Sequence, residues 1–481
     1  MYKSIKFLVA TMVVIGFAHC RTFGESVRIY PAPAGEPLST NFTASVGSSN
    51  LPVYCAKVAT ADPVKRRRIS TRDYASFVDS TSFATFDLNG RAKVTVTCPE
   101  TIREAKVLPS SRGIVPTITG NTMTFDVAKP GALEIEVNGD WVHSFQLFVN
   151  PVEKDAPDPN DPNVIYFGPG IHRVSGMEIT SGKTVYIAGG AVIYGVAGTD
   201  SDTNHATALS VLAGGAVFSL NGNNITLRGR GVIDGGLCPG HTKNLVSICG
   251  TNILVEGVVL TDSSTWTMPV KRSANISIKN IKLFGYRGNA DGIDICNSHD
   301  VSVTDCFLRT MDDLVVVKTP VKDGGESRDI TVSHCVLWNE LAHALSIGAE
   351  LRENVEHVRF SDCDIIHDKG REWLLRVYNC DDGDIHDIKF DNIRAEESNK
   401  LISLWVGTAV WSKDSERGRV ENVTFQNIRA DGADPRVDLK GFDGEHRISD
   451  IRFRDIVING KALQATNVNE NEFVEGVSVK P

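Results

Sequence analysis

A short motif returns eight times in the second half of the chain, and this repetition limits the folds available to it. Each copy begins with Asn, Asp or His and continues with alternating apolar residues. The copies begin 23 to 35 residues apart, at Asn252, Asn275, Asp300, Asp329, His357, Asp387, Asn422 and Asp450. Units of this length, without room for a long helix, predict the coils of a right-handed parallel β-helix. The spacing of a leucine-rich repeat is absent, and a propeller blade would need roughly 40 to 50 residues.

Three cysteines share one position of this motif. Cys306, Cys335 and Cys363 occupy it in successive copies, and equivalent residues of stacked parallel strands lie about 4.8 Å apart. Free cysteine is a small side chain that is commonly buried. These residues therefore predict an interior ladder rather than a metal or catalytic site.

The chain before the repeat has a different pattern. Residues 27–151 alternate polar and apolar residues in short runs separated by Gly and Asn, which predicts a small antiparallel β-sandwich. Residues 152–163 are rich in acidic residues and proline and indicate a linker. The fold class is thus all-β, with a β-helix domain over residues 164–481. Cys55 and Cys98 of the sandwich are candidates for a disulfide.

Residues 1–20 have the features of a signal peptide. Lys3 and Lys6 precede an apolar run over residues 7–17 that is too short to span a bilayer. A lipid anchor at Cys20 is an alternative. We expect a secreted or periplasmic protein with no membrane span.

The overall charge limits the partners. The chain carries 50 basic and 59 acidic residues, a formal net charge of −9, whereas nucleic acids and anionic membranes need a basic face. Cys and His do not have zinc-binding spacing. We expect a monomer that binds a polysaccharide or oligosaccharide, without nucleic acid, metal or cofactor.

A second strand of each coil carries a column of polar residues. Aligned by phase, its first position holds Asp291, Asp313, His343 and Trp373 in four successive coils. Its fourth position holds Asp294, Val316, Ser346 and Arg376, and Asp312 directly precedes Asp313. Carboxylates one coil apart repel each other, which raises at least one pKa. Glycoside hydrolysis needs one protonated acid and one carboxylate base, so the column predicts this chemistry. The competing interpretation is that these Asp residues only cap turns.

The order of these motifs resembles that of the polygalacturonase family and of its clan relative, the dextranase and isopullulanase family. The matching segments, within residues 164–460, are Asn289-Ala290-Asp291, Met311-Asp312-Asp313 with Lys318, Ala342-His343-Ala344 and Arg376-Val377-Tyr378. The resemblance implies single displacement with inversion. It makes Asp312 the general acid, Asp291 and Asp313 the residues that activate water, and His343 the residue that tunes the acid. Such inversion would place acid and base roughly 6.5–9.5 Å apart.

Substrate binding is expected from residues around the column: Asn289, Lys318, Arg376, Tyr378, Trp373 and Tyr286. The last two are preferred over Trp266 and Trp338 as aromatic platforms for sugars. Tyr378 stands where polygalacturonases have a Lys that meets the substrate carboxylate. Because Tyr cannot pair with a carboxylate, the sequence favours a neutral α-glucan such as dextran, with galacturonan as the other substrate.

Two other functions remain open from the sequence. A Ca²⁺-dependent polysaccharide lyase could use the same carboxylates as ligands and Arg376 as its base. A glycan-binding β-helix without catalysis would need no column of repelling carboxylates, which favours the hydrolase.

Overall fold

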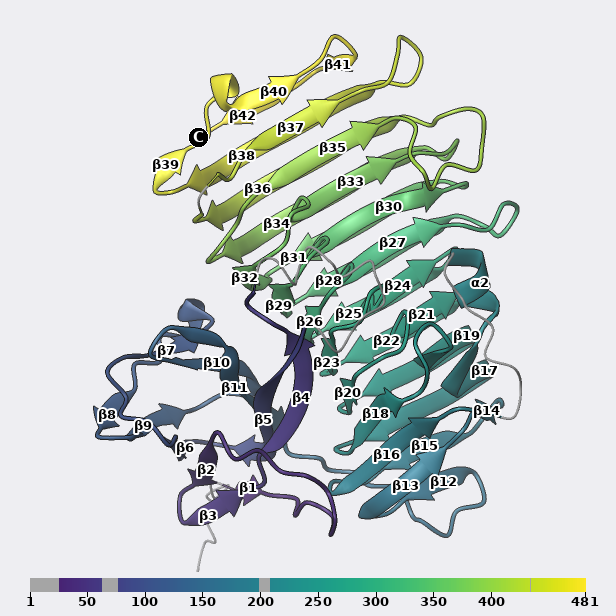
Figure 1. The fold of residues 1–481 in the computed structure, drawn as a ribbon. Helices are drawn as coiled ribbons and strands as arrows, with labels where there is room; N and C mark the ends of the chain where they lie inside the picture. The colour runs from purple at the N-terminus through teal and green to yellow at the C-terminus, as the bar shows by residue number, and fades with distance from the viewer. Residues whose placement is uncertain (1–25, 63–76, 199–207, 433) are drawn as a thin grey trace, which may run out of the picture.

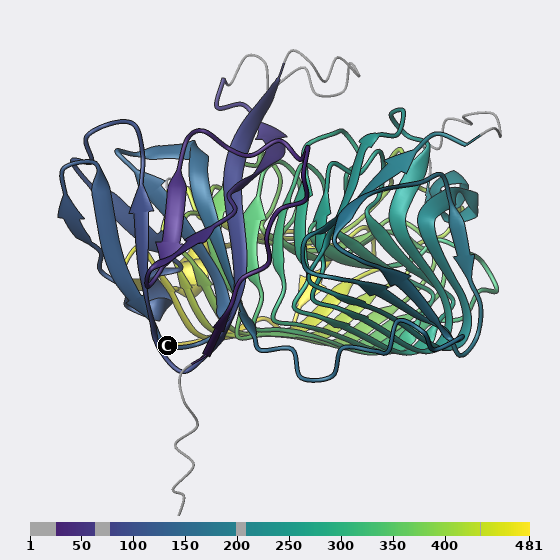
Figure 2. The same ribbon diagram turned by 90° about the horizontal axis from the view of Figure 1, so that it is seen from below.

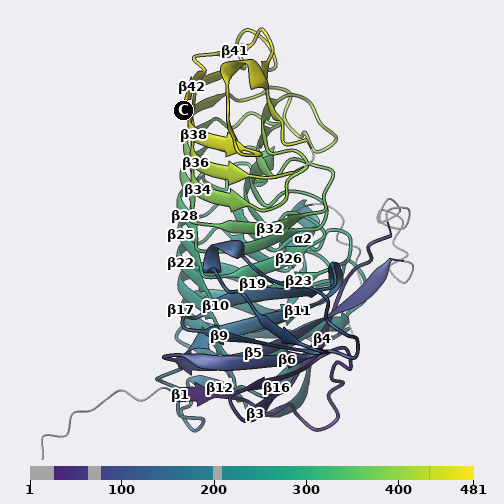
Figure 3. The same cartoon turned by 90° about the vertical axis from the view of Figure 1, so that its left-hand side faces the viewer.

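A computed structural model describes residues 26–62, 77–198, 208–432 and 434–481. It consists of a long column of stacked coils with a smaller β domain packed against the side of its N-terminal half (Figures 1 and 3). One parallel sheet system of 31 strands forms the column. The predicted class, a right-handed parallel β-helix with an N-terminal β-sandwich, is confirmed. The signal peptide and Cys20 anchor lie outside the described residues.

The N-terminal domain is a sandwich of two sheets. The first contains β1 (Ser26–Arg28), β5 (Val78–Asn89), β11 (Asp140–Pro151), β10 (Gly131–Val137) and β7 (Ala105–Leu108), with β4 (Tyr54–Ala59) also paired to β5. The second contains β3 (Ser49–Leu51), β2 (Thr43–Val46), β6 (Ala92–Thr97), β9 (Thr122–Val127) and β8 (Thr117–Thr119). The prediction of a purely antiparallel domain is wrong in one place, because β5 and β11 pair in parallel. The alternation of polar and apolar residues predicts a strand, but it does not show whether two distant strands pair in parallel or antiparallel.

The β-helix has three faces, which we name by their positions. The cleft sheet contains β21 (Met268–Lys271), β24 (Ile293–Cys296), β27 (Val315–Thr319), β30 (Leu345–Leu351), β33 (Leu375–Asn379), β35 (Ile402–Val406), β37 (Val437–Lys440) and β40 (Val468–Glu470). The back sheet contains β12 (Val164–Phe167), β15 (Thr184–Ile187), β22 (Ala274–Lys279), β25 (His299–Thr304), β28 (Ser327–Ser333), β31 (Val355–Ser361), β34 (Ile385–Ala395), β36 (Val420–Ala430) and β38 (Ile448–Ile458). The docking sheet contains β13 (Gly170–Val174), β16 (Ala191–Val196), β18 (Val232–Leu237), β20 (Val259–Thr261), β23 (Lys282–Gly285), β26 (Phe307–Thr310), β29 (Val336–Asn339) and β32 (Asp364–Asp368).

The remaining elements complete the ends and corners of the column. β14 (Met177–Ile179) pairs with β17 (Gly215–Gly229), which pairs along its length with β19 (Lys243–Glu256). β39 (Lys461–Ala462), β41 (Val474–Glu475) and β42 (Ser478–Lys480) close the C-terminal end, and a short helix, α2 (Ala208–Ala213), lies beside the cleft sheet. Seen from below, the coils lie behind one another with the sandwich at one side (Figure 2). Among the described residues, none of the helices has the length and hydropathy to cross a membrane.

The first residue of each repeat turns the chain into the back sheet. All eight starting residues adopt the left-handed conformation, with φ between 52° and 59°. Short polar side chains tolerate this conformation far better than β-branched ones. Their amides also pair between coils, as in Asn252 Nδ2 to Asn224 Oδ1 at 3.1 Å. The Asn, Asp or His of the motif is therefore required by the corner.

Ladders of identical side chains fill the interior. Cys306, Cys335 and Cys363 are at most 1% exposed and stack on one another, as predicted. Further along the column the rings of Phe360, Phe390, Phe425 and Phe453 stack with centroids 4.6–5.4 Å apart. The repeat of the backbone thus becomes a repeat of packing contacts.

Apolar contacts join the two domains. Tyr54, Phe83 and Phe148 of the sandwich pack in one buried cluster with Phe284 and Phe307 of the docking sheet. Ion pairs also join the two domains: Arg230 pairs with Asp87 at 2.8 Å in a buried position, and the half-exposed Lys57 pairs with the buried Asp262 at 2.7 Å. Full burial of each large apolar side chain contributes about 1.5–3 kcal/mol, so the sandwich is a fixed part of the molecule.

The proposed Cys55–Cys98 disulfide is wrong. Both cysteines are free: Cys55 is exposed on β4, whereas Cys98 is buried in the core between the two sheets. The Cys98 thiol donates instead to the Glu100 carbonyl at 3.2 Å. Proximity in sequence did not reveal that the two residues belong to different sheets.

Candidate active site

The polar column lies on the cleft sheet in the expected register. Ile293 pairs with Val315, Val315 with Leu345, and Leu345 with Leu375. The residues two places before each of these, Asp291, Asp313, His343 and Trp373, therefore follow one another from coil to coil. The alignment made from the sequence is correct.

A cavity of about 480 Å³ opens over this column. Eight of the ten predicted site residues line it: Asn289, Asp291, Asp312, Asp313, Lys318, His343, Arg376 and Tyr378. Leu209 and Val211 of α2 form part of one wall. The cavity is large enough for a sugar residue and its neighbours.

Three carboxylates converge at the floor of the cavity. One oxygen from each of Asp291, Asp312 and Asp313 lies within 4.8 Å of the other two. The expected separation of roughly 6.5–9.5 Å is too long for these nearest oxygens, because Asp312 and Asp313 are adjacent and Asp291 is only one coil away. Asp294, which was not among the predicted site residues, completes the cluster from below.

Lys318 holds the cluster together. Its ammonium lies 3.0 Å from Asp294, 3.3 Å from Asp291 and 3.8 Å from Asp313. Lys318 is buried, and burial alone would lower its pKa, but the carboxylates of Asp294 and Asp291 raise it well above the usual value. The lysine is therefore charged at neutral pH and serves as the counter-ion of the carboxylates. Because its ammonium is paired with three carboxylates, Lys318 supports the cluster rather than binding substrate directly.

Burial makes these carboxylates hard to ionise. Desolvation, followed by the charge of Asp291, raises the pKa of Asp312 to about 7. The pKa values of Asp294 and Asp313 also rise to about 7, again first through burial. That of Asp291 is raised well above its ordinary value by burial and by Asp294. At neutral pH the cluster therefore retains part of its protons, as an acid and base site requires.

His343 is a neutral hydrogen-bonding group. Its Nδ1 lies 2.6 Å from the Trp373 carbonyl oxygen and must donate to it, because a carbonyl only accepts. Burial and the nearby Arg376 lower the pKa of His343 to about 3. Nε2 therefore carries a lone pair that can accept a hydrogen bond in the cavity.

Arg376 and Tyr378 form one unit on β33. The guanidinium of Arg376 lies 4.3 Å from the centre of the Tyr378 ring, whose edge packs against Trp405. Nε of Arg376 has no hydrogen-bond partner within the described parts of the chain. Arg376 can therefore donate to a ligand, whereas Tyr378 offers an aromatic surface.

The two aromatic platforms preferred from the sequence are not in the cavity wall. Tyr286 is 5% exposed and packs in a separate apolar cluster with Met311, between Lys57 and Arg287. Trp373 does not line the cavity, and its carbonyl oxygen accepts a hydrogen bond from His343. Trp266 lines the cavity instead, with Lys318 lying 4.0 Å from its ring centre. A position next to a motif in the sequence was therefore not enough to predict whether an aromatic ring faces the cavity.

Other cavity residues escaped the sequence analysis. Glu350 lines the cavity from the end of β30, and Arg371 lines it from the segment between β32 and β33. Trp411 and Lys413 line it from the loop that follows β35. Loops have no periodicity from which a facing direction can be read. The adjacent apolar residues Val410 and Trp411 were the available signal in the sequence. In the structure they are 85% and 47% exposed, and adjacent exposed apolar residues in a loop indicate a binding surface.

The carboxylate cluster could also be considered as a cation site. Asp291, Asp312 and Asp313 supply enough oxygens. However, the Lys318 ammonium contacts two of the three residues and already supplies a positive charge. A divalent cation at this position would meet that charge, which disfavours the Ca²⁺-dependent lyase.

A carboxylate cluster in a cavity has the composition that glycoside hydrolysis requires. The chain matches the family model described as glycosyl hydrolases family 28 over residues 175–476, and it belongs to that family.

Individual relatives are more distant. The chain is 26% identical over 184 residues to "Exopolygalacturonase clone GBGE184" of Arabidopsis thaliana and 25% identical over 199 residues to "Probable exopolygalacturonase B" of Aspergillus terreus. Each match covers 37% of this chain, and the chain spans 42% and 43% of the length of these relatives. The fold is similar to that of Dex49A from Penicillium minioluteum, with a TM-score of 0.60, 11% identity, and 94% and 96% of the two chains covered.

Proposed function

We propose that the chain hydrolyses a glycosidic bond of an oligosaccharide or polysaccharide by a single displacement with inversion at the anomeric carbon. The observation that carries the proposal of hydrolysis is the convergence of Asp291, Asp312 and Asp313 oxygens within 4.8 Å, on the floor of a cavity of sugar size. Inversion is proposed from the membership of the glycosyl hydrolases family 28 and not from this spacing. Export from the cell is part of the proposal, because a polysaccharide is too large to enter a cell intact.

Asp312 is proposed as the general acid. It is the least buried of the three carboxylates, and its pKa of about 7 leaves much of it protonated at neutral pH. The Asp313 amide donates to Asp312 Oδ1 at 3.1 Å, which fixes the carboxyl group. The other oxygen is then available to give its proton to the leaving glycosidic oxygen.

Asp291 and Asp313 are proposed to hold and deprotonate the attacking water. Hydrogen bonds of about 2.8 Å allow one water to bridge oxygens up to roughly 5.6 Å apart, and the spacing in this cluster is 4.8 Å or less. Lys318 lies between both residues and stabilises the charged form of the pair. The tight cluster is therefore compatible with a water between two bases, even though the acid is close.

His343 and Arg376 are proposed to bind the sugar. His343 Nε2 can accept from a hydroxyl, and Arg376 Nε can donate to a ring or exocyclic oxygen. Trp266 provides an apolar surface in the same cavity.

Two substrates are candidates. The names of the curated relatives favour galacturonan. The second candidate is a neutral α-glucan such as dextran, because Tyr378 stands at the position where a basic residue would meet the carboxylate of galacturonate.

The experiment is the Asp312→Asn variant followed by analysis of the released anomer. The substitution removes the proton donor and retains its shape, so kcat falls by about a hundredfold or more. The loss is smaller for substrates with good leaving groups, which need little protonation. NMR at early times follows the anomer released by the unmodified enzyme. Retention of configuration, or full activity of Asp312→Asn, contradicts the assignment.

A further inference from the structure

The loop between β35 and β36, residues 407–419, forms an outer wall of the cavity. It presents Trp411 and Lys413 to the same space as the catalytic carboxylates. Neither residue belongs to a motif of the family resemblance, and both lie more than 30 residues after Tyr378 in the chain.

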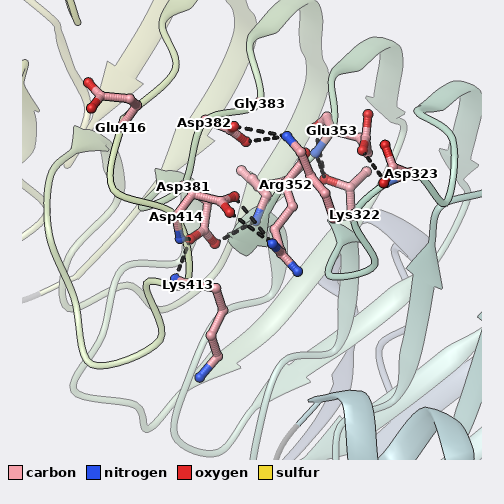
Figure 4. A network of polar contacts seen from close by, with 12 residues as sticks. Lys322, Asp323, Arg352, Glu353, Asp381, Asp382, Gly383, Lys413, Asp414 and Glu416 are labelled. Carbon is pink, nitrogen blue, oxygen red and sulfur yellow. Dashed lines mark hydrogen bonds and ion pairs between the residues drawn. The ribbon is translucent and has the colours of Figure 1, made fainter.

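A buried carboxylate fixes this loop. Asp381 is fully buried, and its Oδ1 accepts the amide hydrogens of Lys413 at 2.5 Å and Asp414 at 3.0 Å. Its Oδ2 accepts the Leu351 amide hydrogen at 3.2 Å. The backbone that carries Lys413 is therefore attached to the end of cleft strand β30. Figure 4 shows Asp381 beside Lys413 and Asp414.

The charged neighbours of Lys413 are neutralised by one another. Arg352 pairs with Asp414 at 2.9 Å, and Lys322 pairs with Asp382 at 2.9 Å. In Figure 4 the ammonium of Lys413 points away from these pairs. It has no hydrogen-bond or ion-pair partner anywhere in the described ranges of the chain. A rigid backbone thus holds an uncompensated cation at the wall of the cavity.

An anionic sugar would need such a cation. The floor of the cavity carries the carboxylates, which repel a second negative charge in a poorly solvated space. Tyr378 cannot provide the compensation, and Lys318 is already paired with three carboxylates. The two arginines of the lining, Arg371 and Arg376, each lie 3.8 Å from the carboxylate of Glu372. A cation at the wall can offset this repulsion and form a charge-assisted hydrogen bond.

We propose that Lys413 is a specificity-determining residue that binds the carboxylate of a uronic acid residue, in place of the basic residue absent at position 378. Trp411, 47% exposed two residues earlier, offers a stacking surface to the same or the next sugar. This inference rests on the proposed hydrolase function and decides between its two substrates.

The test compares Lys413→Met, Lys413→Arg and unmodified enzyme on oligogalacturonides and on the same oligosaccharides after reduction of their carboxyl groups. Lys461→Met, an exposed lysine at the C-terminal end of the column, is the matched control. We expect Lys413→Met to lower kcat/KM on the acidic oligosaccharides about tenfold to a hundredfold, mainly through KM, since a charged hydrogen bond is lost. On the reduced oligosaccharides the change is less than about twofold, and Lys413→Arg retains most activity.

Other results overturn the inference. An equal loss on both forms of the oligosaccharide indicates a structural role for Lys413, and no loss on either form means that it does not touch the substrate. Cleavage of a neutral α-glucan in preference to both forms also contradicts it, although the hydrolase proposal then stands. Failure of the hydrolase proposal itself is recognised separately, because the unmodified enzyme then cleaves neither the acidic nor the reduced oligosaccharides nor an α-glucan.

Discussion

Side chains stack from coil to coil both in the interior and on the cleft face, but the stacking is favourable in the interior and unfavourable on the cleft face. Inside the column, Cys306, Cys335 and Cys363 stack one coil apart and are almost completely buried. On the cleft face, Asp291 and Asp313 stack in the same way, also with little exposure. Stacked apolar groups gain contacts in every coil. Stacked carboxylates lose hydration and repel each other, and Lys318 offsets part of this cost.

The comparison shows where stability and function divide in this architecture. The backbone spacing is the same on both faces, so it cannot be the source of the difference. The difference comes from the side chains. An apolar ladder stabilises the stack, whereas the buried carboxylates have raised pKa values and remain partly protonated at neutral pH. The same repeated geometry thus supplies both the core and the proposed acid and base groups.

Phe390→Ala, a change in the interior ladder, should cause a large loss of stability. Phe390 is fully buried, and its ring stacks on Phe360 at 4.8 Å and on Phe425 at 4.6 Å. Removal of a buried phenyl ring leaves a cavity and costs about 3–5 kcal/mol of the free energy of unfolding. Denaturant unfolding measures it, with Phe390→Leu as the milder control. A cost below about 1 kcal/mol would mean that the ladder contributes little.

Asp294→Asn, a change in the charged column, should increase stability at neutral pH. The pKa of Asp294 is raised to about 7 in the folded chain, against an ordinary value of 3.8. Between these values the folded chain holds a proton that the unfolded chain has released, so stability present at low pH is lost as pH rises from about 4 to about 7. The variant should therefore gain about 1–3 kcal/mol at pH 7 and little at pH 4.

The matched control for Asp294→Asn is Asp126→Asn, which changes an exposed residue of strand β9. Thermal or denaturant unfolding at both pH values gives the answer. If Asp294→Asn destabilises the protein equally at both, its pairing with Lys318 outweighs the burial of its charge.

His343→Ala should have the smallest effect, on the shape of the pH profile. Because its pKa is lowered to about 3, His343 stays neutral over the working range and does not itself titrate there. Its removal admits water to the carboxylates, which lowers their pKa values and moves the alkaline limb of activity to lower pH by up to about one unit. The maximum rate should fall less than about tenfold. His343→Gln can still donate to the Trp373 carbonyl and is the control. An unshifted profile with a much lower maximum would assign His343 directly to the chemistry.

The sequence predicted those features that follow from strict repetition. The left-handed corners favour Asn, Asp or His, and the inward positions hold apolar residues, so coil length, register and the polar column could all be predicted. Asp291, Asp313 and His343 follow one another because the register carries them.

The sequence did not predict which way individual side chains face or which distant segments contact each other. Tyr286 and Trp266 are both aromatic residues close to the polar column in sequence, yet only Trp266 lines the cavity, because Tyr286 is taken up by packing against the sandwich domain. Lys413 and Trp411 come from a loop whose position depends on Asp381, about 30 residues away, and no local pattern records that attachment.

The docking of the sandwich also has a consequence for biosynthesis. Its strands end at Pro151, before the first strand of the β-helix. A chain made from its N-terminus completes the sandwich while the docking sheet is still being translated. The apolar residues of that sheet, such as Phe284 and Phe307, can then meet a finished partner surface as they emerge, rather than wait exposed to other chains. The sandwich can thus protect the nascent column from aggregation over the half of its length that it covers.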